Sequence, residues 1–400
     1  MTLGSLKNVA TGSAKIVQVE IARYDYLGKG SFKFFPPGPD GKIRRPSVLV
    51  RLTDEEGVQG IGQAVPIPTW TYETPATVES TLRDYLAPAL IGADPADLAA
   101  IHERMNRVIR PAFSVGQPLC KAAIDLACFD LVGRRLAKSA GELLAELAPP
   151  AGAGAPRKQL VMSWTVNSPD MAVVEEQLEE GRRLGYTNFN IKVGAPQSPE
   201  YDLELARKVR AFAPEGFLWA DANTGYTVEQ ALQIAPKLAD AGVDVLESPL
   251  PPNRIRGYQA LKKQGALPIL MDEGILSPVE AEEFVELGMM DGIAMKPARN
   301  AGLYPSVAMI SLLQERGLWV LGSGLTDPDL SLAASLHLYG WAGITHPCAL
   351  NGPQFLAESL ALNPLIPREG VLEAPGGPGL GLKLDPERIE DVFRKGIRVS

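Results

Sequence analysis

Five polar residues that can bind a metal or move a proton stand at the ends of five short apolar runs: Lys192, Asp221, Glu247, Asp272 and Lys296. The intervals between them run from 24 to 29 residues, and a short strand, a helix of about three turns and two loops need about that length. The spacing therefore predicts repeated βα units with these side chains at the carboxyl ends of neighbouring parallel strands. In a closed (β/α)8 barrel those ends converge on one mouth, where active sites lie.

The three carboxylates of this set, Asp221, Glu247 and Asp272, favour a divalent cation. No His or Cys stands beside them in the sequence, and ligand sets made of oxygen alone suit Mg²⁺, or Mn²⁺, better than Zn²⁺. Three such charges brought together without a cation would repel, so that at least one carboxyl would be held in its neutral form. We predict a magnesium site. The alternative is three unrelated strand-end acids, either solvated or paired with helix N-termini.

The two lysines, Lys192 and Lys296, come one strand before and one strand after the carboxylates. In barrel geometry they would lie on opposite sides of a ligand bound over the metal. A partly desolvated place near a cation lowers the pKa of a lysine, which lets it act as a general base. The alternative for a lone strand-end lysine is a solvated charge or an ion-pair partner. Asn223 and Glu273, each next to a proposed ligand, are expected to orient the metal site.

A barrel domain at residues 158–355 would position these residues. A Pro/Gly/Ala-rich linker at 149–157 precedes it, and a first strand is expected at 160–166. The five runs described above supply the next strands, 318–323 a seventh, and 343–346 the start of an eighth. The predicted fold class is α/β, a TIM-like (β/α)8 barrel with an N-terminal α+β capping domain.

The capping domain is predicted at residues 16–148. Three alternating runs indicate an antiparallel meander, and helical patterns follow at 77–90, 95–109 and 118–136. Two loops, at 26–43 and 66–74, are long and aromatic enough to cover the active site. The second loop carries Trp70 and Tyr72, whose rings suit an apolar or cationic substrate end, unless they only pack the capping domain on the barrel.

The two ends of the chain are expected to differ. Residues 1–15 are rich in Gly, Ser, Thr and Ala and contain no apolar signal core, which predicts a disordered tail. Residues 356–400 are expected to return to the capping domain through a strand-like run at 379–384. The net charge of −8 and the absence of a basic run argue against a nucleic-acid partner.

Composition also bears on membranes and redox state. No apolar stretch approaches the roughly 20 residues that span a bilayer, so no membrane partner is expected. The three cysteines form no CxxC pattern and leave one unpaired, which favours reduced thiols in a cytoplasm.

Short motifs around these residues resemble the enolase superfamily, in its muconate-lactonizing-enzyme-like subgroup. They are KAAIDLACFDLVGRRL at 121–136, DAN at 221–223, ESP at 247–249, DEG at 272–274 and MKPARNAG at 295–302. The resemblance spans nearly the whole chain. It implies a carboxylate substrate bound to Mg²⁺, removal of its α-proton by a lysine, and an enediolate stabilised by the metal. It also implies a homo-oligomer. Lys296, in place of a histidine, argues against the mandelate-racemase-like subgroup.

Three positions depart from the subgroup's pattern. Asn190 stands where the subgroup usually carries the first lysine of Lys-x-Lys, which removes a cation near the substrate carboxylate. Thr326 stands where relatives often carry glutamate. Asn351 lies in the stretch where dipeptide epimerases carry Asp-x-Asp before Gly-Pro. Without that carboxylate pair the free ammonium of a dipeptide loses its counter-ion, which argues against dipeptide epimerisation.

The reaction itself stays open between several classes. Two opposed lysines favour racemisation or epimerisation of a small carboxylate, by removing the proton from one face and returning it on the other. The same pair supports dehydration of a hydroxy acid, and cycloisomerisation is a further alternative, weakened by the loss of the cation at Asn190. A Schiff-base aldolase on the same barrel, with Lys192 or Lys296 as nucleophile, is the rival from another mechanistic class.

Overall fold

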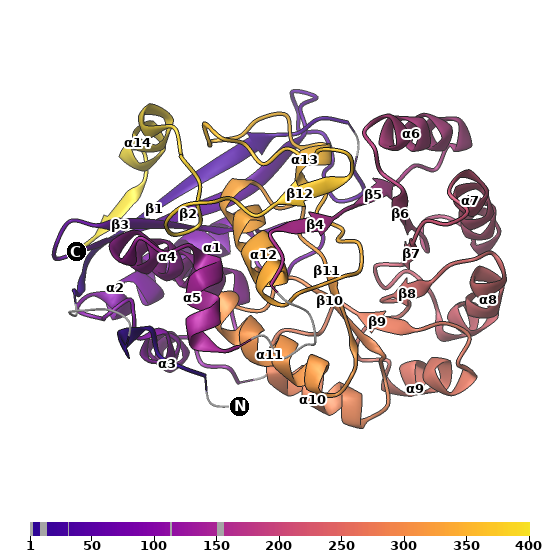
Figure 1. Ribbon diagram of the computed structural model, residues 1–400, viewed down its shortest axis with the longest axis horizontal. Coiled ribbons are helices and arrows are strands. Elements are labelled where there is room, and N and C mark those ends of the chain that lie inside the picture. Colours follow the sequence, from indigo (N-terminus) through magenta and orange to yellow (C-terminus); the bar gives the residue numbers. More distant parts are fainter. Residues whose placement is uncertain (1–2, 9–13, 31, 113, 150–155) are drawn as a thin grey trace.

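The computed structural model describes residues 3–8, 14–30, 32–112, 114–149 and 156–400. An antiparallel sheet with its helices occupies one side of the molecule, and a parallel sheet with surrounding helices occupies the other (Figure 1). We call the first the capping region and the second the parallel-sheet region. None of the described helices is long and apolar enough to cross a membrane.

The sheet of the capping region has the order β13-β1-β2-β3, with antiparallel pairing throughout. Its strands are β1 (Ile16–Leu27), β2 (Arg44–Asp54), β3 (Gln59–Ala64) and β13 (Ile397–Val399). Gly60 and Gly62 of β3 allow this sheet to meet a helix at backbone distance. A Cβ at Gly62 would lie 1.9 Å from the carbonyl oxygen of Ala123, so a side chain there would force the two layers apart.

Helices cover one face of that sheet. They are α1 (Pro75–Thr81), a π-helical turn at Leu82–Leu86, α2 (Ala87–Leu90), α3 (Leu98–Val108), α4 (Pro118–Leu136) and α5 (Ala140–Leu147). The helix predicted at 118–136 is observed as α4, and almost all of its side chains are buried. The sequence did not predict α5, although Ser139 and Glu142 form a capping box at its start.

The expectation of a disordered tail is wrong for residues 3–8. Leu6 is fully buried at the start of a short 3-10 helix, Leu6–Asn8. The N–H of Gly4 donates to the carbonyl of Leu147 at 2.7 Å, and Lys7 pairs with Asp97 at 2.6 Å. One apolar anchor between polar neighbours is enough to dock the segment, and a composition argument does not detect it. Residues 1–2 and 9–13 lie outside the described chain.

The parallel-sheet region has seven strands in the order β11-β10-β9-β8-β7-β6-β5. The strands are β5 (Ser163–Val166), β6 (Asn188–Lys192), β7 (Leu218–Asp221), β8 (Val245–Glu247), β9 (Ile269–Met271), β10 (Gly292–Met295) and β11 (Trp319–Gly322). Each is followed by a helix: α6 (Met171–Arg183), α7 (Pro199–Phe212), α8 (Val228–Asp240), α9 (Ile255–Gln264), α10 (Pro278–Glu286), α11 (Leu303–Glu315) and α12 (Asp329–Trp341). Figure 1 shows α6 to α9 on the outside of these strands. This alternation is the predicted βα rhythm.

The eighth strand predicted at 343–346 is not formed, because these residues make the turn that ends α12. Cys348 and Ala349 lie between the two edges of the sheet instead. The Cys348 carbonyl accepts the N–H of Ser163 at 2.9 Å, and the N–H of Ala349 donates to Gly322 at 2.8 Å. These are isolated parallel bridges, so only two residues connect β5 with β11.

The first predicted strand, 160–166, is split into two. Its start is β4 (Gln159–Val161), which pairs antiparallel with β12 (Val371–Glu373), and its end is β5. Beyond the bridge at Cys348, the side chain of Gln354 takes over pairing with β5. Its amide oxygen accepts the N–H of Thr165 at 3.1 Å, and its amide nitrogen donates to the carbonyl of Thr165 at 2.8 Å.

The C-terminal segment runs back to the capping region through α13 (Gly352–Phe355), β12 and α14 (Pro386–Arg394). The yellow α14 lies beside the purple strands in Figure 1, and β13 pairs with β1. The run at 379–384 is not a strand, contrary to the prediction. It packs on α4, where Asp130 accepts the N–H of Leu380 at 2.9 Å.

Three buried carboxylates tie these segments together, and we call them the α4 acids: Asp125 and Asp130 in α4, and Glu73 just before α1, which contacts the start of α4. Glu73 accepts the N–H groups of the first turn of α4 at 2.8 and 3.1 Å. Asp125 accepts the N–H groups at the start of α11 at 2.5 and 3.3 Å. Asp130 joins β3 to the C-terminal segment. Each therefore satisfies backbone donors that a helix end or a bend leaves unpaired.

Candidate active site

The carboxyl ends of β6 to β10 bring together the five residues that the sequence singles out. Lys192 is the register partner of Asp221, and Asp221 that of Glu247, so their Cα atoms are one strand spacing apart, about 4.8 Å. Asp272 follows β9 directly and Lys296 follows β10. All except Lys192 are at most 2% exposed, and the Lys192 side chain is 9% exposed. We call these five residues the strand-end cluster.

Within the cluster the two lysines form ion pairs with the carboxylates. Lys192 Nζ contacts Asp221. Lys296 Nζ lies 2.7 Å from Asp272 and 3.4 Å from Glu247. The two ammonium groups thus approach the carboxylates from the two ends of the row, in agreement with the predicted flanking arrangement.

Arg299 is a further member of this site that the sequence reading missed. It is 2% exposed, and its Nε lies 2.9 Å from Oδ1 of Asp272. The signal was the second basic residue in MKPARN, three positions beyond Lys296. Its placement depends on the tight turn after β10, where the N–H of Arg299 donates to the Lys296 carbonyl at 2.9 Å.

The pKa of Lys296 does not follow the expectation of a lowered value. Burial disfavours its charged form, but the attraction of Asp272 and Glu247 outweighs burial and raises the pKa. At Asp221, burial likewise opposes ionisation, yet Lys192 and Lys296 together hold the pKa of the carboxyl below its usual range. The reason is that each carboxylate and the ammonium group beside it stabilise each other's charged form.

Of the three carboxyl groups, Glu247 is the one whose negative charge is least balanced by its surroundings. Burial, then repulsion by Asp221 and Asp272, raises its pKa well above the usual range, as expected for three acids that share two ammonium groups. Two buried oxygens nearby also lack a hydrogen-bond partner among the described residues: Oδ1 of Asn223 and Oε2 of Glu273. Surplus negative charge and unsatisfied oxygen donors fit a hard divalent cation.

The ligands are not already gathered around one point. Within the described ranges, no three His, Cys, Asp or Glu side chains form a ready-made metal cluster, and lysine ammonium groups lie against the carboxylates. Asp221, Glu247 and Asp272 are the residues that would hold the cation once those ion pairs open.

Asn223 contacts the cluster directly, and Glu273 contacts Asn223. The N–H of Asn223 donates to Oδ1 of Asp221 at 2.9 Å, and its side-chain amide donates to Oδ2 at 3.1 Å. The same amide lies 3.4 Å from Glu273. Asn223 adopts a left-handed backbone with φ of 42°, which folds the chain back onto Asp221. These contacts fix the orientation of the Asp221 carboxylate.

Trp70 of the capping region lies over the cluster. Its indole N–H donates to Glu273 at 2.8 Å, and its ring centre lies 5.4 Å from Nζ of Lys296 and 5.9 Å from Nζ of Lys192. Phe34, from the first covering loop, stacks on it at 4.3 Å. Tyr72 is mostly exposed, and its hydroxyl accepts the N–H of Gly274 at 3.2 Å. Both predicted covering loops therefore reach the site.

The predicted substrate-contact residues Asn190, Thr326 and Asn351 are polar but uncharged. Asn190 is 2% exposed, and its amide oxygen accepts from the hydroxyls of Ser163 and Thr165 at 3.3 and 3.0 Å. Asn351 donates to the Thr165 hydroxyl at 3.3 Å. Thr326 is fully buried, with no partner for its hydroxyl among the described residues. We call Asn190, Thr326 and Asn351 the neutral wall; Asn190 shares β6 with Lys192 of the cluster.

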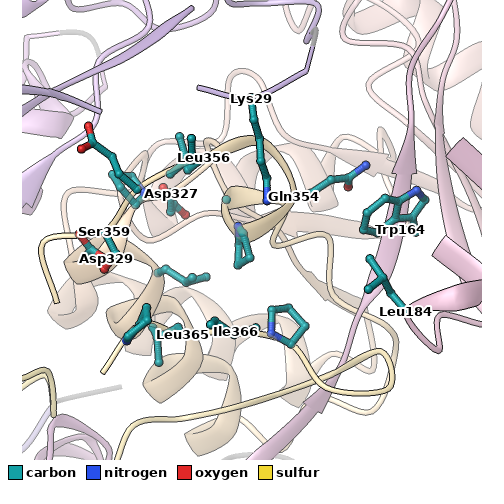
Figure 2. A pocket seen from close by; sticks show the side chains of 18 of the residues that line it. Lys29, Trp164, Leu184, Asp327, Asp329, Gln354, Leu356, Ser359, Leu365 and Ile366 are labelled. Atoms are coloured by element: carbon teal, nitrogen blue, oxygen red, sulfur yellow. Dashed lines mark hydrogen bonds between the residues drawn. The ribbon is translucent and has the colours of Figure 1, made fainter. Parts of the chain in front are cut away.

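A separate hollow of about 430 Å³ lies outside this site. Figure 2 shows Lys29, Trp164, Leu356 and Ile366 around it. None of the five strand-end residues lines it, and Trp164 stands on the outward side of β5, against Gly181 of α6. The hollow is therefore not the catalytic site.

A seven-stranded parallel sheet with acids and lysines on consecutive strand ends, covered by an α+β region, defines an enolase-like enzyme. Two family models match the chain. "Mandelate racemase / muconate lactonizing enzyme, N-terminal domain" matches residues 42–145, and "Enolase C-terminal domain-like" matches residues 173–388. The chain belongs to the mandelate racemase/muconate lactonizing enzyme family of the enolase superfamily. It is thus an enzyme of a divalent-metal-dependent isomerase family, and the resemblance to the muconate-lactonizing-enzyme-like subgroup is confirmed.

Curated relatives match along most of their length. Chloromuconate cycloisomerase CbnB of Cupriavidus necator is 30% identical over 352 residues, which cover 87% of this chain and 91% of the relative. Muconate cycloisomerase 1 of Rhodococcus opacus is 27% identical, with 86% and 90% covered.

Solved structures of muconate and chloromuconate enzymes also match the chain along most of its length. The muconate lactonizing enzyme from Pseudomonas putida superposes with a TM-score of 0.83 at 25% identity, over 94% of this chain and 99% of that one. The 2-chloromuconate cycloisomerase from Rhodococcus opacus 1CP superposes with a TM-score of 0.84 at 26% identity, over 94% and 99%. The fold is that of these enzymes.

Proposed function

We propose that the protein is a metal-assisted isomerase that moves a proton at the carbon next to a substrate carboxylate, and that its reaction is cycloisomerisation of an unsaturated dicarboxylate of the muconate type. The observation that carries the proposal is the row of three carboxylates with one lysine at each end. The relatives over nearly the whole chain are named cycloisomerases. Racemisation, the first expectation from the sequence, has no such support.

The residues assign the parts of this chemistry. Asp221, Glu247 and Asp272 would hold the cation, which we take to be Mg²⁺ with Mn²⁺ as the alternative. When bound, the cation would neutralise the negative charge that grows on the substrate carboxylate. One carboxylate oxygen of the substrate adds to the double bond conjugated with the other carboxylate, at the carbon of that bond farther from it, and Lys192 or Lys296 delivers a proton to the carbon next to that other carboxylate. The lysine then regains a proton from solvent.

We take the parallel sheet to be part of a closed, eight-stranded barrel. The two bridges of Cys348 and Ala349 support closure, as do the contacts of Gln354 with β5. Closure would place the neutral wall directly opposite the strand-end cluster, so that a bound substrate touches both.

The neutral wall would bind the second end of the substrate. Asn190 uses its amide oxygen on two hydroxyls, which leaves its amide nitrogen to donate to a carboxylate oxygen. Such a hydrogen bond replaces the ion pair that a lysine would make at this position. We therefore expect weaker binding of a distal carboxylate than in a relative with lysine there, since charge-assisted hydrogen bonds are about twice as strong as neutral ones.

The test is turnover of cis,cis-muconate and of its chlorinated derivatives with Mg²⁺, followed by the loss of diene absorbance. In D₂O the lactone formed should carry one deuterium next to the carboxylate. If the enzyme, saturated with Mg²⁺, turned over no unsaturated dicarboxylate, this reaction would be excluded. Turnover that survives EDTA, together with covalent trapping by borohydride, would point to the Schiff-base alternative instead.

Racemisation remains a second candidate because Lys192 and Lys296 approach from the two ends of the acid row. Its test uses single enantiomers of N-acyl amino acids and proline derivatives in D₂O. Exchange of the α-proton in both enantiomers, without reaction of muconates, would favour it over cycloisomerisation.

A further inference from the structure

Arg45, at the start of β2, is completely buried and is bonded to backbone carbonyls rather than to a carboxylate. Its guanidinium donates six hydrogen bonds, between 2.5 and 3.3 Å. The acceptors are the carbonyl oxygens of Pro46, Val65, Pro66, Leu325 and Thr326. No carboxylate lies within ion-pair distance of it among the described residues, so the arginine serves peptide groups.

These carbonyls belong to segments on different sides of the site. Val65 and Pro66 begin the covering loop that carries Trp70, whereas Leu325 and Thr326 form the loop after β11. The two loops come from the capping region and from the parallel-sheet region, 260 positions apart in the chain. A single side chain thus joins both halves of the molecule where they meet over the strand-end cluster.

The first covering loop is attached at the same point. The guanidinium carbon of Arg45 lies 5.6 Å from the ring centre of Phe35, a cation–π distance. The neighbouring Phe34 stacks on Trp70, and its carbonyl accepts the hydroxyl of Thr69 at 3.0 Å. Both covering loops therefore meet at Arg45.

Only arginine can make this junction. Its planar group offers five N–H donors in a fixed fork and stays charged even where burial lowers its pKa to about 10. A lysine has three donors on one nitrogen and cannot span carbonyls on opposite sides. A methionine would fill the space but leave buried carbonyls without donors, which the surrounding backbone can relieve only by moving.

We propose that Arg45 is a positioning residue that holds the two covering loops and the loop after β11 together, and thereby keeps Trp70 over Lys192 and Lys296. This inference goes beyond the proposed reaction and does not depend on which substrate is used. It concerns the cover of the site in the enzyme alone.

Arg51 offers a matched control on the same strand. It is 4% exposed and bonded to Glu20 and Glu390, and its guanidinium lies 4.4 Å from the ring of Phe393. All of its partners lie in β1 and α14. Replacing Arg51 should therefore cost stability without touching either covering loop.

The experiment compares Arg45→Met with Arg51→Met in the full chain without substrate. Amide hydrogen exchange read by mass spectrometry should be about tenfold or more faster in peptides 65–74 and 323–329 of Arg45→Met. It should match the wild type there in Arg51→Met. Acrylamide should also quench Trp70 fluorescence more strongly in Arg45→Met, with Trp70→Phe variants of each protein giving the background from the other four tryptophans.

Wild-type exchange and quenching in a folded Arg45→Met protein would overturn the inference. Equal acceleration of the same peptides in Arg51→Met would also overturn it, since the effect would then be general destabilisation. If Arg45→Met does not fold, Arg45→Lys takes its place, with an intermediate acceleration expected and wild-type behaviour decisive against the proposal. Because these readouts need no turnover, they stand even where the proposed cycloisomerisation fails.

Discussion

The α4 acids are as deeply buried as the three carboxylates of the strand-end cluster, each being at most 2% exposed. Their partners differ. The α4 acids accept backbone N–H groups at 2.5 to 3.3 Å, donors whose position is fixed by helix ends and bends. The strand-end carboxylates face ammonium groups on long side chains, and Asp272 also faces the guanidinium of Arg299.

The difference lies in the donors rather than in burial: each of the α4 acids accepts two backbone N–H groups, whereas among the strand-end carboxylates of the described chain Asp221 alone accepts one, from Asn223. A backbone donor commits its acceptor to the fold, because removing either one leaves a buried polar group unpaired. A lysine can leave its carboxylate without unfolding anything, which frees the oxygens for a cation and the ammonium for proton transfer. We therefore expect the strand-end carboxylates to be free to bind a cation, and the α4 acids to stay bonded to the backbone.

The largest expected effect that follows is on turnover. Lys192→Ala should lower kcat by about 10²–10⁴-fold, the usual contribution of a positioned acid or base, while Mg²⁺ binding persists. Steady-state kinetics on an active carboxylate and calorimetric titration with Mg²⁺ measure the two. Lys237→Ala, on the exposed face of α8, is the control and should change neither. A kcat for Lys192→Ala within tenfold of the wild type would remove this lysine from the proton-transfer step.

The next effect tests the structural side of the comparison. Asp125→Asn should destabilise the protein by about 3 kcal/mol, because an amide can no longer accept from both N–H groups at the start of α11 and from His102. Denaturant unfolding measures the change, and kcat of the folded fraction should stay near that of the wild type. If stability were unchanged, backbone bonding would not be what holds the α4 acids in place.

A smaller effect of opposite sign is expected at the strand ends. Glu247→Gln should leave the metal-free protein as stable as the wild type or more stable by about 1–2 kcal/mol, since burial and its neighbours already disfavour the charge. Saturating Mg²⁺, at about 100 times its Kd, should stabilise the wild type by about 2.7 kcal/mol but not this variant. Thermal unfolding with and without Mg²⁺ gives both numbers. Full Mg²⁺ stabilisation in Glu247→Gln would exclude Glu247 as a ligand.

The strand-end cluster was predictable from sequence because its members end strands of one parallel sheet. Register then requires that Asp221 and Glu247 stand side by side, whatever the loops do. The same reasoning could not give the pKa of Lys296, because the sign depends on which carboxylates its ammonium group reaches. Arg299 escaped for a similar reason, as it lies beyond the strand on a turn.

Other features could not be predicted because they arise from contacts between separate segments and not from a local sequence pattern. In place of the predicted eighth strand, Cys348 and Ala349 make isolated bridges, and Gln354, six residues beyond Cys348, adds side-chain hydrogen bonds to β5. No periodic pattern marks such a substitution. Leu6 anchors the N-terminal segment by a single side chain, which likewise leaves no pattern. The sequence therefore predicts regular helices and strands well, but it does not predict single side chains that make contacts in their place.

The smallest expected effect is on the pH dependence of stability. It concerns a buried histidine that contacts the same segment as one of the α4 acids. His337 of α12 is 5% exposed, and its ring nitrogen lies 3.4 Å from the carbonyl of Leu380, the residue whose N–H Asp130 accepts. Burial lowers the pKa of His337 from 6.5 to about 4. The unfolded chain therefore takes up the proton first, so this group costs stability as the pH falls from about 6.5 to about 4.

At pH 5.5 the loss amounts to about 1 kcal/mol relative to pH 7.5. His337→Asn should remove that part of the pH dependence, while His346→Asn, at a residue that is half-buried and stacked on Trp319, serves as the matched variant. Urea unfolding at the two pH values measures the difference between them. If His337→Asn kept the full wild-type slope, the proton would be taken up elsewhere, and burial of His337 would not account for this part of the pH dependence.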